Sequence, residues 1–177
     1  MIAKVPAGSG NNFIVKCEFL IPSISSSFVE PCTVALFHAD HSFVLSHRLD
    51  IRNVYKFCDD VSIDNPHGVD PVVNIALRGD CPFDAKVRIA EKNIHNRGVV
   101  IVDNSEVDEL MAPGSADTNY RSTHPCIMVG HNFLNKIEEI KKNLTIVHSK
   151  ANKEDDVDIY TNITFTLGMY WTLLFVI

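Results

Sequence analysis

The sequence predicts an α/β domain, and two alternations of strand and helix carry that prediction. The first occupies residues 72–104 and reads as strand, tight turn, amphipathic helix and second strand. The second occupies residues 125–147 and repeats the order of strand, helix and strand. At 177 residues the chain can form one domain with a sizeable core, and its 46% hydrophobic content is ordinary for a folded protein. These alternations therefore predict an α/β domain.

A change of hydrophobic period defines the first unit. Residues 72–77 form a short apolar run that suits a buried strand, and the Arg-Gly-Asp tripeptide at 78–80 ends it with turn-forming residues. Pro82 suits a first helical turn, because its missing N–H would have no partner there. The apolar positions then recur at helical spacing, at Phe83, Val87, Ala90 and Ile94. Residues 99–102 return as a buried strand, for which a parallel crossover is the default.

The other elements are predicted with the same reasoning. Residues 125–129 form a buried strand, residues 133–140 an amphipathic helix with Asn132 as N-cap, and residues 144–147 a further strand. Toward the N-terminus, residues 13–21 are expected as an edge strand. Two more strands, at residues 33–37 and from Phe43, are expected to form a hairpin around a turn at 38–41. Residues 49–57 are ambiguous.

Composition divides the chain into four parts. Residues 1–30 are poorly defined, residues 31–149 form the domain, and the charged residues 150–162 form a polar linker. The last 15 residues, 163–177, carry no charge, and we interpret them as the start of a transmembrane helix, for which about 20 apolar residues are needed. The alternative is a final core strand of the domain.

The five cysteines suggest a disulfide framework, because no Cys-x-x-Cys pair is present. Cys58 and Cys81 flank the loop and strand at the centre of the chain, and a bridge between them would contribute roughly 3 kcal/mol on the chain-entropy model. Cys17 and Cys32 are the next most economical pair, which leaves Cys126 free. Connectivity stays open at this stage.

Two tripeptides, beginning at Asn143 and Asn162, match the pattern for N-glycosylation and agree with a secretory compartment. The net charge of −6 and the absence of a basic stripe exclude nucleic acid as a partner.

No catalytic centre, cofactor site or metal site is predicted. His38 and His41, with His47 nearby, could supply imidazole ligands, but their spacing fits a solvated turn better. Cys126 lies two residues from His124 within an apolar strand pattern, where an inert thiol is the commoner reading. The turn at 78–80 resembles an integrin-binding tripeptide, yet its position at a strand end already explains it. A nucleotide site is also disfavoured, because the helix start offers no glycine-lined phosphate cradle.

In order along the chain, several motifs resemble the protease-associated (PA) domain. These are residues 75–83 (IALRGDCPF), 86–90 (KVRIA), 98–102 (GVVIV) and 125–129 (PCIMV), with His124 in place of the usual isoleucine. The resemblance covers about residues 33–147. It implies an α/β domain with a strand core flanked by helices. Such a domain is generally non-catalytic and binds or gates the substrates and partners of the protein that carries it.

Finer motifs suggest a parent protein. Residues 32–37, the pair Phe57-Cys58 and residues 111–114 look like the luminal PA domain of signal-peptide-peptidase-like intramembrane aspartyl proteases. The runner-up is a PA–transmembrane–RING ubiquitin ligase, which residues 108–110 and 114–115 echo; sorting receptors and mannosidase-like proteins remain alternatives. Whether the parent is an enzyme stays open, since its catalytic aspartates would lie in later helices.

The resemblance implies a glycoprotein in an endosomal or lysosomal membrane of the secretory system. Its PA domain would be luminal or extracellular. Protein or peptide partners would bind its loops, chiefly residues 59–71 and 105–123, and its C-terminal segment would contact the membrane.

Overall fold

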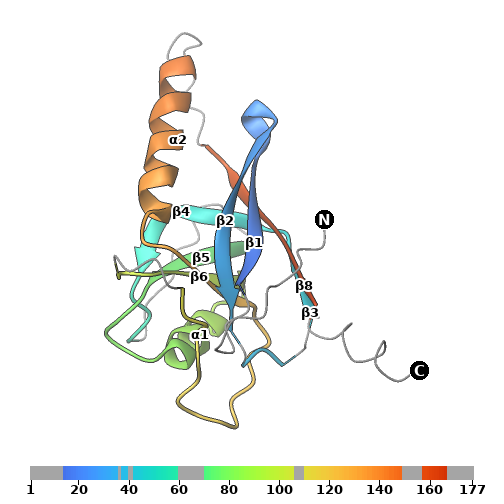
Figure 1. Ribbon diagram of the computed structural model, residues 1–177, viewed down its shortest axis with the longest axis vertical. Helices are drawn as coiled ribbons and strands as arrows, with labels where there is room; N and C mark the ends of the chain where they lie inside the picture. Colours follow the sequence, from blue (N-terminus) through green and yellow to red (C-terminus); the bar gives the residue numbers. More distant parts are fainter. Residues whose placement is uncertain are drawn as a thin grey trace, which may run out of the picture.

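The computed structural model describes residues 14–35, 37–39, 42–59, 70–105, 110–148 and 157–166. Its elements, coloured along the chain in Figure 1, are β1 (Ile14–Ile21), the short 3-10 helix η1 (Pro22–Ile24), β2 (Ser26–Val34), β3 (Ser42–Leu45), β4 (Arg48–Tyr55), β5 (Val72–Leu77), α1 (Phe83–Glu91), β6 (Asn96–Val102), β7 (Cys126–Val129), α2 (Phe133–His148) and β8 (Ile159–Thr166).

All described strands belong to one sheet, in the order β1-β2-β7-β6-β5-β4-β8-β3. The strands from β4 to β7 run parallel to one another, and the remaining pairs are antiparallel. β8 pairs with β4 on one side and with β1 on the other, so the sheet closes on itself into a barrel. β3 pairs with the far half of β8 and extends the sheet beyond the ring.

Aromatic side chains form the centre of the barrel core. Phe19 is fully buried, and its ring centroid lies 5.1 Å from that of Phe28 and 4.9 Å from that of Phe133 on α2. The apolar face of α2 continues with Ile137 and Leu144, which belong to the same buried cluster. α2 therefore packs against the inner face of the β1–β2 hairpin, beside which it stands in Figure 1.

A second core lies on the outer side of the parallel strands, where α1 packs. Val87 and Ala90 of α1 are buried with Ala76 of β5 and Ile101 of β6. The strand β5 thus has both faces covered, which is typical of a parallel strand and explains its unbroken apolar run. The predicted β-α-β unit is confirmed, with β5 parallel to β6 and α1 between them in the chain.

Three local predictions were wrong. The first strand is no edge strand, because β1 pairs on both sides. The expected hairpin does not form: β3 pairs with β8, and the segment after β2 is tied to the loop before β7 by a bridge between His38 and Ser122. Residues 144–147 continue α2 instead of forming a strand, because Leu144 extends the helical spacing of Ile137 and Ile140.

The sheet also extends beyond the expected domain limits of 31 and 149. Residues 14–30 form β1, η1 and the start of β2, and β8 takes in the end of the expected linker. Residues 163–166, the beginning of the expected transmembrane helix, lie in β8, with Ile163 buried. The rest of that segment lies outside the described residues, within which no helix is long and apolar enough to cross a membrane.

The aromatic cluster generates a stability prediction. We expect Phe19→Ala to lower the free energy of unfolding by about 3–5 kcal/mol, because it leaves a cavity between two other rings. Val44→Ala, at a position that is 67% exposed, should change it by less than about 0.5 kcal/mol. Urea denaturation followed by circular dichroism measures both, and equal effects would show that Phe19 is not central to the core.

Candidate functional site

The carboxyl ends of β4, β5, β6 and β7 meet at one edge of the sheet, which is where parallel α/β sheets commonly place their binding loops. There Arg78 Nη1, from the turn after β5, lies 2.8 Å from Asp103 Oδ1, just after β6. The Asp103 side chain is 2% exposed, so this ion pair is largely shielded from solvent. The arginine of the Arg-Gly-Asp tripeptide is therefore held at the sheet edge by its ion pair with Asp103.

From this edge, residues 110–124 form a long connection without regular helix or strand, which ends at the opposite edge of the sheet, where His124 contacts Asn96 at the start of β6. Its beginning is fixed by Thr33, whose hydroxyl donates to the Met111 carbonyl oxygen over 2.8 Å. Its middle is fixed to α1 by Arg88, whose Nη2 lies 2.7 Å from Asp117 Oδ2. The Arg88 guanidinium also stacks over the Tyr120 ring, 3.8 Å from its centroid. Along this loop, Met111, Gly114 and residues 116–119 are exposed.

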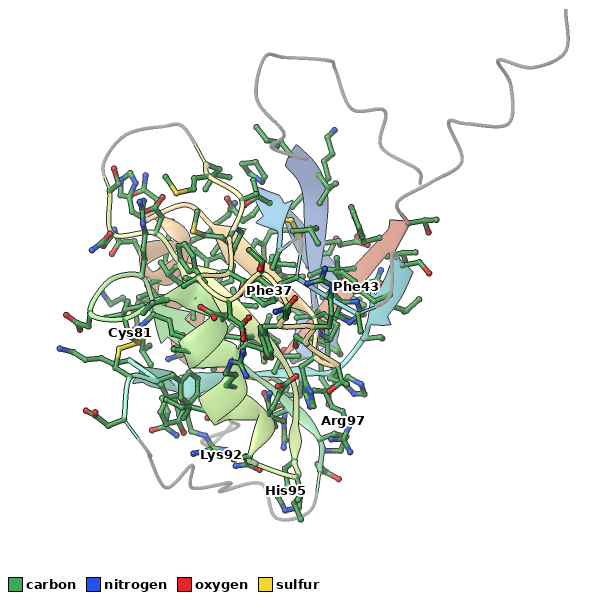
Figure 2. All side chains as sticks on the ribbon, turned by 90° about the horizontal axis from the view of Figure 1, so that it is seen from below. Phe37, Phe43, Cys81, Lys92, His95 and Arg97 are labelled. Carbon is green, nitrogen blue, oxygen red and sulfur yellow. A yellow bond between two sulfur atoms is a disulfide. The ribbon has the colours of Figure 1, made fainter. Side chains whose placement is uncertain are left out.

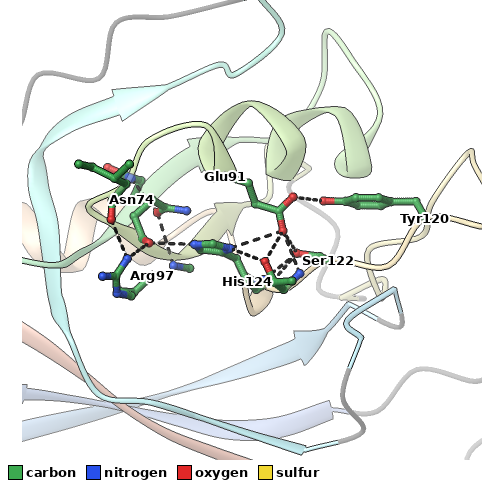
Figure 3. A network of polar contacts seen from close by, with 10 residues as sticks. Asn74, Glu91, Arg97, Tyr120, Ser122 and His124 are labelled. Carbon is green, nitrogen blue, oxygen red and sulfur yellow. Dashed lines mark hydrogen bonds and ion pairs between the residues drawn. The ribbon is translucent and has the colours of Figure 1, made fainter.

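Glu91, the last residue of α1, fixes the end of this loop (Figure 3). Its carboxylate accepts hydrogen bonds from the Tyr120 hydroxyl (2.8 Å), the Ser122 hydroxyl (2.7 Å) and the Thr123 backbone N–H (2.9 Å). His124 Nδ1 lies 3.5 Å away. We call this set of contacts the Glu91 latch.

Electrostatics follow from this geometry. Burial opposes ionisation of Glu91, but the hydrogen bonds from His124, Ser122, Tyr120 and Thr123 outweigh it and lower the pKa of Glu91 to about 2. Burial raises the pKa of Tyr120, and its hydrogen bond to Glu91 raises it further. Near neutral pH, the Glu91 side chain is therefore ionised and the Tyr120 hydroxyl keeps its proton.

The latch contains a serine, a histidine and a glutamate, yet their arrangement does not activate a nucleophile. Ser122 is fully buried, and its hydroxyl contacts Glu91 and the His124 backbone instead of the imidazole. His124 Nε2 donates to the Asn96 carbonyl oxygen over 2.9 Å, so this nitrogen is unavailable as a general base. The set therefore orients the loop.

The structure also places the cysteine and the histidines that the sequence offered as possible catalytic or metal-binding residues. Cys126 is a free, buried thiol whose pKa is raised by burial, as expected of an inert cysteine. His38 packs its ring against Phe43, with centroids 5.3 Å apart. Burial lowers the pKa of His47, and the neighbouring Arg97 adds to the effect. His41 lies outside the described residues, among which no group of three or more potential ligands could hold a metal ion.

Both expected disulfides, Cys17–Cys32 and Cys58–Cys81, are present. The two glycosylation candidates, Asn143 on α2 and Asn162 on β8, are exposed, and the Asn162 amide donates to Glu18 Oε2 over 2.7 Å. Of the loops expected to bind partners, residues 60–69 and 106–109 lie outside the described part of the chain.

The Glu91 latch was missed by the sequence reasoning. A signal for it existed, because an acidic residue in the last turn of a helix is unfavourable beside the negative end of the helix dipole and suggests a specific partner. The partner itself, some thirty residues later in a loop, has no local signature.

No protein-family model matches the sequence, and neither does any curated protein. Solved structures do resemble the fold. BSAP, a zinc aminopeptidase from Bacillus subtilis, gives a TM-score of 0.53 at 11% identity, covering 88% of this chain and 31% of the enzyme. An aminopeptidase from Aneurinibacillus sp. strain AM-1 gives 0.49 at 13% identity, covering 85% of this chain and 30% of the enzyme. The chain thus spans less than a third of their length. The first likeness supports a PA-like fold and carries no activity with it.

The latch generates a pH-dependent prediction. Because the folded-state pKa of Glu91 lies below its ordinary 4.5, its stabilising effect is present above about pH 4.5 and is lost as the pH falls toward 2. At pH 7 we expect Glu91→Gln to lower the free energy of unfolding by about 1–3 kcal/mol. This difference from wild type should shrink between pH 4.5 and 2. Glu138→Gln, at a side chain that is 58% exposed, is the control. Urea titrations at several pH values measure this difference in the free energy of unfolding. A difference that does not change with pH would contradict the role assigned to the Glu91 carboxylate.

Proposed function

We propose that this chain is a non-catalytic PA-type domain that binds protein or peptide partners through the loop at residues 110–124. The observation that carries the proposal is that this loop lacks regular structure yet is anchored along its length. Thr33 holds its start, Arg88 its middle and Glu91 its end. A loop held in this way loses little conformational entropy on binding, which favours affinity.

The chemistry of the exposed part of the loop suits a protein partner. Met111 is 44% exposed and offers an adaptable apolar contact. Residues 116–119 (ADTN) add small and polar side chains that can form hydrogen bonds at the rim of an interface. No basic cluster lies in the loop, so nucleic acid is not a fitting ligand.

A luminal or extracellular location is part of the proposal, as are glycans at Asn143 and Asn162. The two disulfides support it, because such bridges persist mainly in oxidising compartments. Within this setting we propose the signal-peptide-peptidase-like intramembrane proteases as the parent family. The RING-type ubiquitin ligases are the alternative, and a sorting receptor is a third.

Site-specific photocrosslinking tests the binding proposal. A photoreactive amino acid is placed at Met111 or Thr118, and at Val44 on β3 as an exposed control. With luminal extract from the source cells, we expect one and the same partner to be captured from both loop positions and not from Val44. Glu91→Gln, which loosens the loop, should reduce the captured amount severalfold. Capture that is equal at all three positions, or unchanged by Glu91→Gln, would refute the loop as the binding surface.

Full-length transcript sequencing tests the parent family. Tyr-Asp and Gly-x-Gly-Asp motifs in hydrophobic segments downstream of residue 177 are the expected result, since these carry the catalytic aspartates of the protease family. A downstream Cys/His RING would favour the alternative. A transcript with neither would reject both parents while leaving the binding proposal to the crosslinking result.

A further inference from the structure

The two disulfides occupy different surroundings. Cys17 and Cys32 are fully buried inside the barrel core. Cys58 and Cys81 are partly exposed, and their bridge lies at the periphery of the molecule, where Figure 2 labels Cys81. It links the segment after β4 to the turn before α1. The second bridge therefore lies closer to solvent than the first.

A buried lysine adjoins the accessible bridge. Lys86 of α1 is 0% exposed, and its ammonium donates to the Lys56 carbonyl oxygen and lies 3.5 Å from Cys58 Sγ. Burial lowers the pKa of Lys86, with Asp80 opposing the effect and Lys56 adding to it. A neutral disulfide sulfur gives this ammonium little in return. A thiolate at the same place would be a far stronger partner.

The two sulfurs of the bridge are not equivalent. Cys58 Sγ lies 3.5 Å from the Lys86 donor and 3.6 Å from the Lys56 carbonyl oxygen, to which that ammonium also donates, whereas Cys81 Sγ lies 3.4 Å from the Phe57 carbonyl oxygen. A carbonyl can accept from a protonated thiol but repels a thiolate. Acidic residues adjoin both cysteines in the chain, Asp59 after Cys58 and Asp80 before Cys81, so it is the Lys86 ammonium that distinguishes the two sulfurs. Negative charge is thus favoured on Cys58.

Backbone strain surrounds the same bridge. Phe57 and Asp80, each directly before one of the two cysteines, have φ angles of 52° and 64°. Such left-handed conformations are rare for a bulky residue like Phe57 and cluster at functional sites. This agrees with a bridge that does more than staple the fold.

We propose that Cys58–Cys81 is a thiol–disulfide exchange site that reacts with a dithiol reductant, with Cys58 as the leaving thiolate held by Lys86. One reductant thiolate attacks Cys81 Sγ, forms a mixed disulfide there and releases Cys58 as a thiolate. The second thiol of the reductant then closes on the first and releases Cys81. Two electrons pass to the protein and the reductant leaves as a disulfide; of the two protons of the dithiol, one is released to solvent when the attacking thiolate forms, and the other ends on Cys81, while Cys58 stays a thiolate beside Lys86. This proposal is independent of partner binding through the loop.

The position of a trapped mixed disulfide tests the direction of attack. The folded protein is treated briefly with reduced glutathione, a monothiol that has no second thiol to close the step within one molecule, then alkylated and mapped by mass spectrometry. We expect glutathione on Cys81 with Cys58 alkylated, while Cys17–Cys32 stays intact. Glutathione on Cys58, or opening of Cys17–Cys32 at the same rate, would overturn the proposal. This test needs no variant.

Substitution of the lysine tests its role. Lys86→Met keeps the length of the buried chain and removes its charge, so the bridge should open about tenfold more slowly, in line with the dependence of exchange on the leaving thiol. Lys142→Met, at an exposed position on α2, should leave the rate unchanged. Circular dichroism verifies the fold of each variant. An unchanged rate in folded Lys86→Met would reject the lysine, and if that variant does not fold, the glutathione mapping of the wild type decides alone.

Discussion

The fold depends on the pairing of β8 with both β1 and β4. Without that strand, β4 and β1 would each present an open edge, and the apolar side chains between them would face solvent. Ile159 and Ile163 of β8 complete the same buried cluster as Phe19 and Phe133. Closure therefore supplies backbone partners and core volume in one step, and it fixes the parallel strands.

The parts of the fold with local signatures could be predicted from the sequence. The bounds of β5 coincide with the predicted apolar run, because a strand covered on both faces shows its limits directly. The start of α2 could likewise be predicted, and so could the two disulfides, each of which joins cysteines that are neighbours along the chain. Closure was not, because the register that sets Glu18 against Asn162 joins distant segments. No local pattern in β1 or β8 reveals that the two strands pair. The residues of β8 were therefore assigned partly to a linker and partly to a membrane helix.

The candidate site shows the same limit. Sequence reasoning placed function on the loops around the core, and residues 110–124 form the larger described part of them. It could not find the anchors, since Thr33 on β2 and Arg88 and Glu91 on α1 lie far from the loop in the chain. Lys86 is a charged residue on an amphipathic helix, and the structure nevertheless buries it against the bridge. Polar residues are placed by tertiary partners, which periodicity does not report.

The contrast between local bridges and distant closure has a consequence for biosynthesis. The paired cysteines are 15 and 23 residues apart, and each pair consists of consecutive cysteines along the chain. A chain that emerges from its N-terminus can therefore oxidise each pair in turn, before Cys126 appears and long before β8 is made. Because Cys126 is synthesised after the other four cysteines, its thiol is absent while the two disulfides form. The ring then closes last, around cysteines whose partners are already chosen.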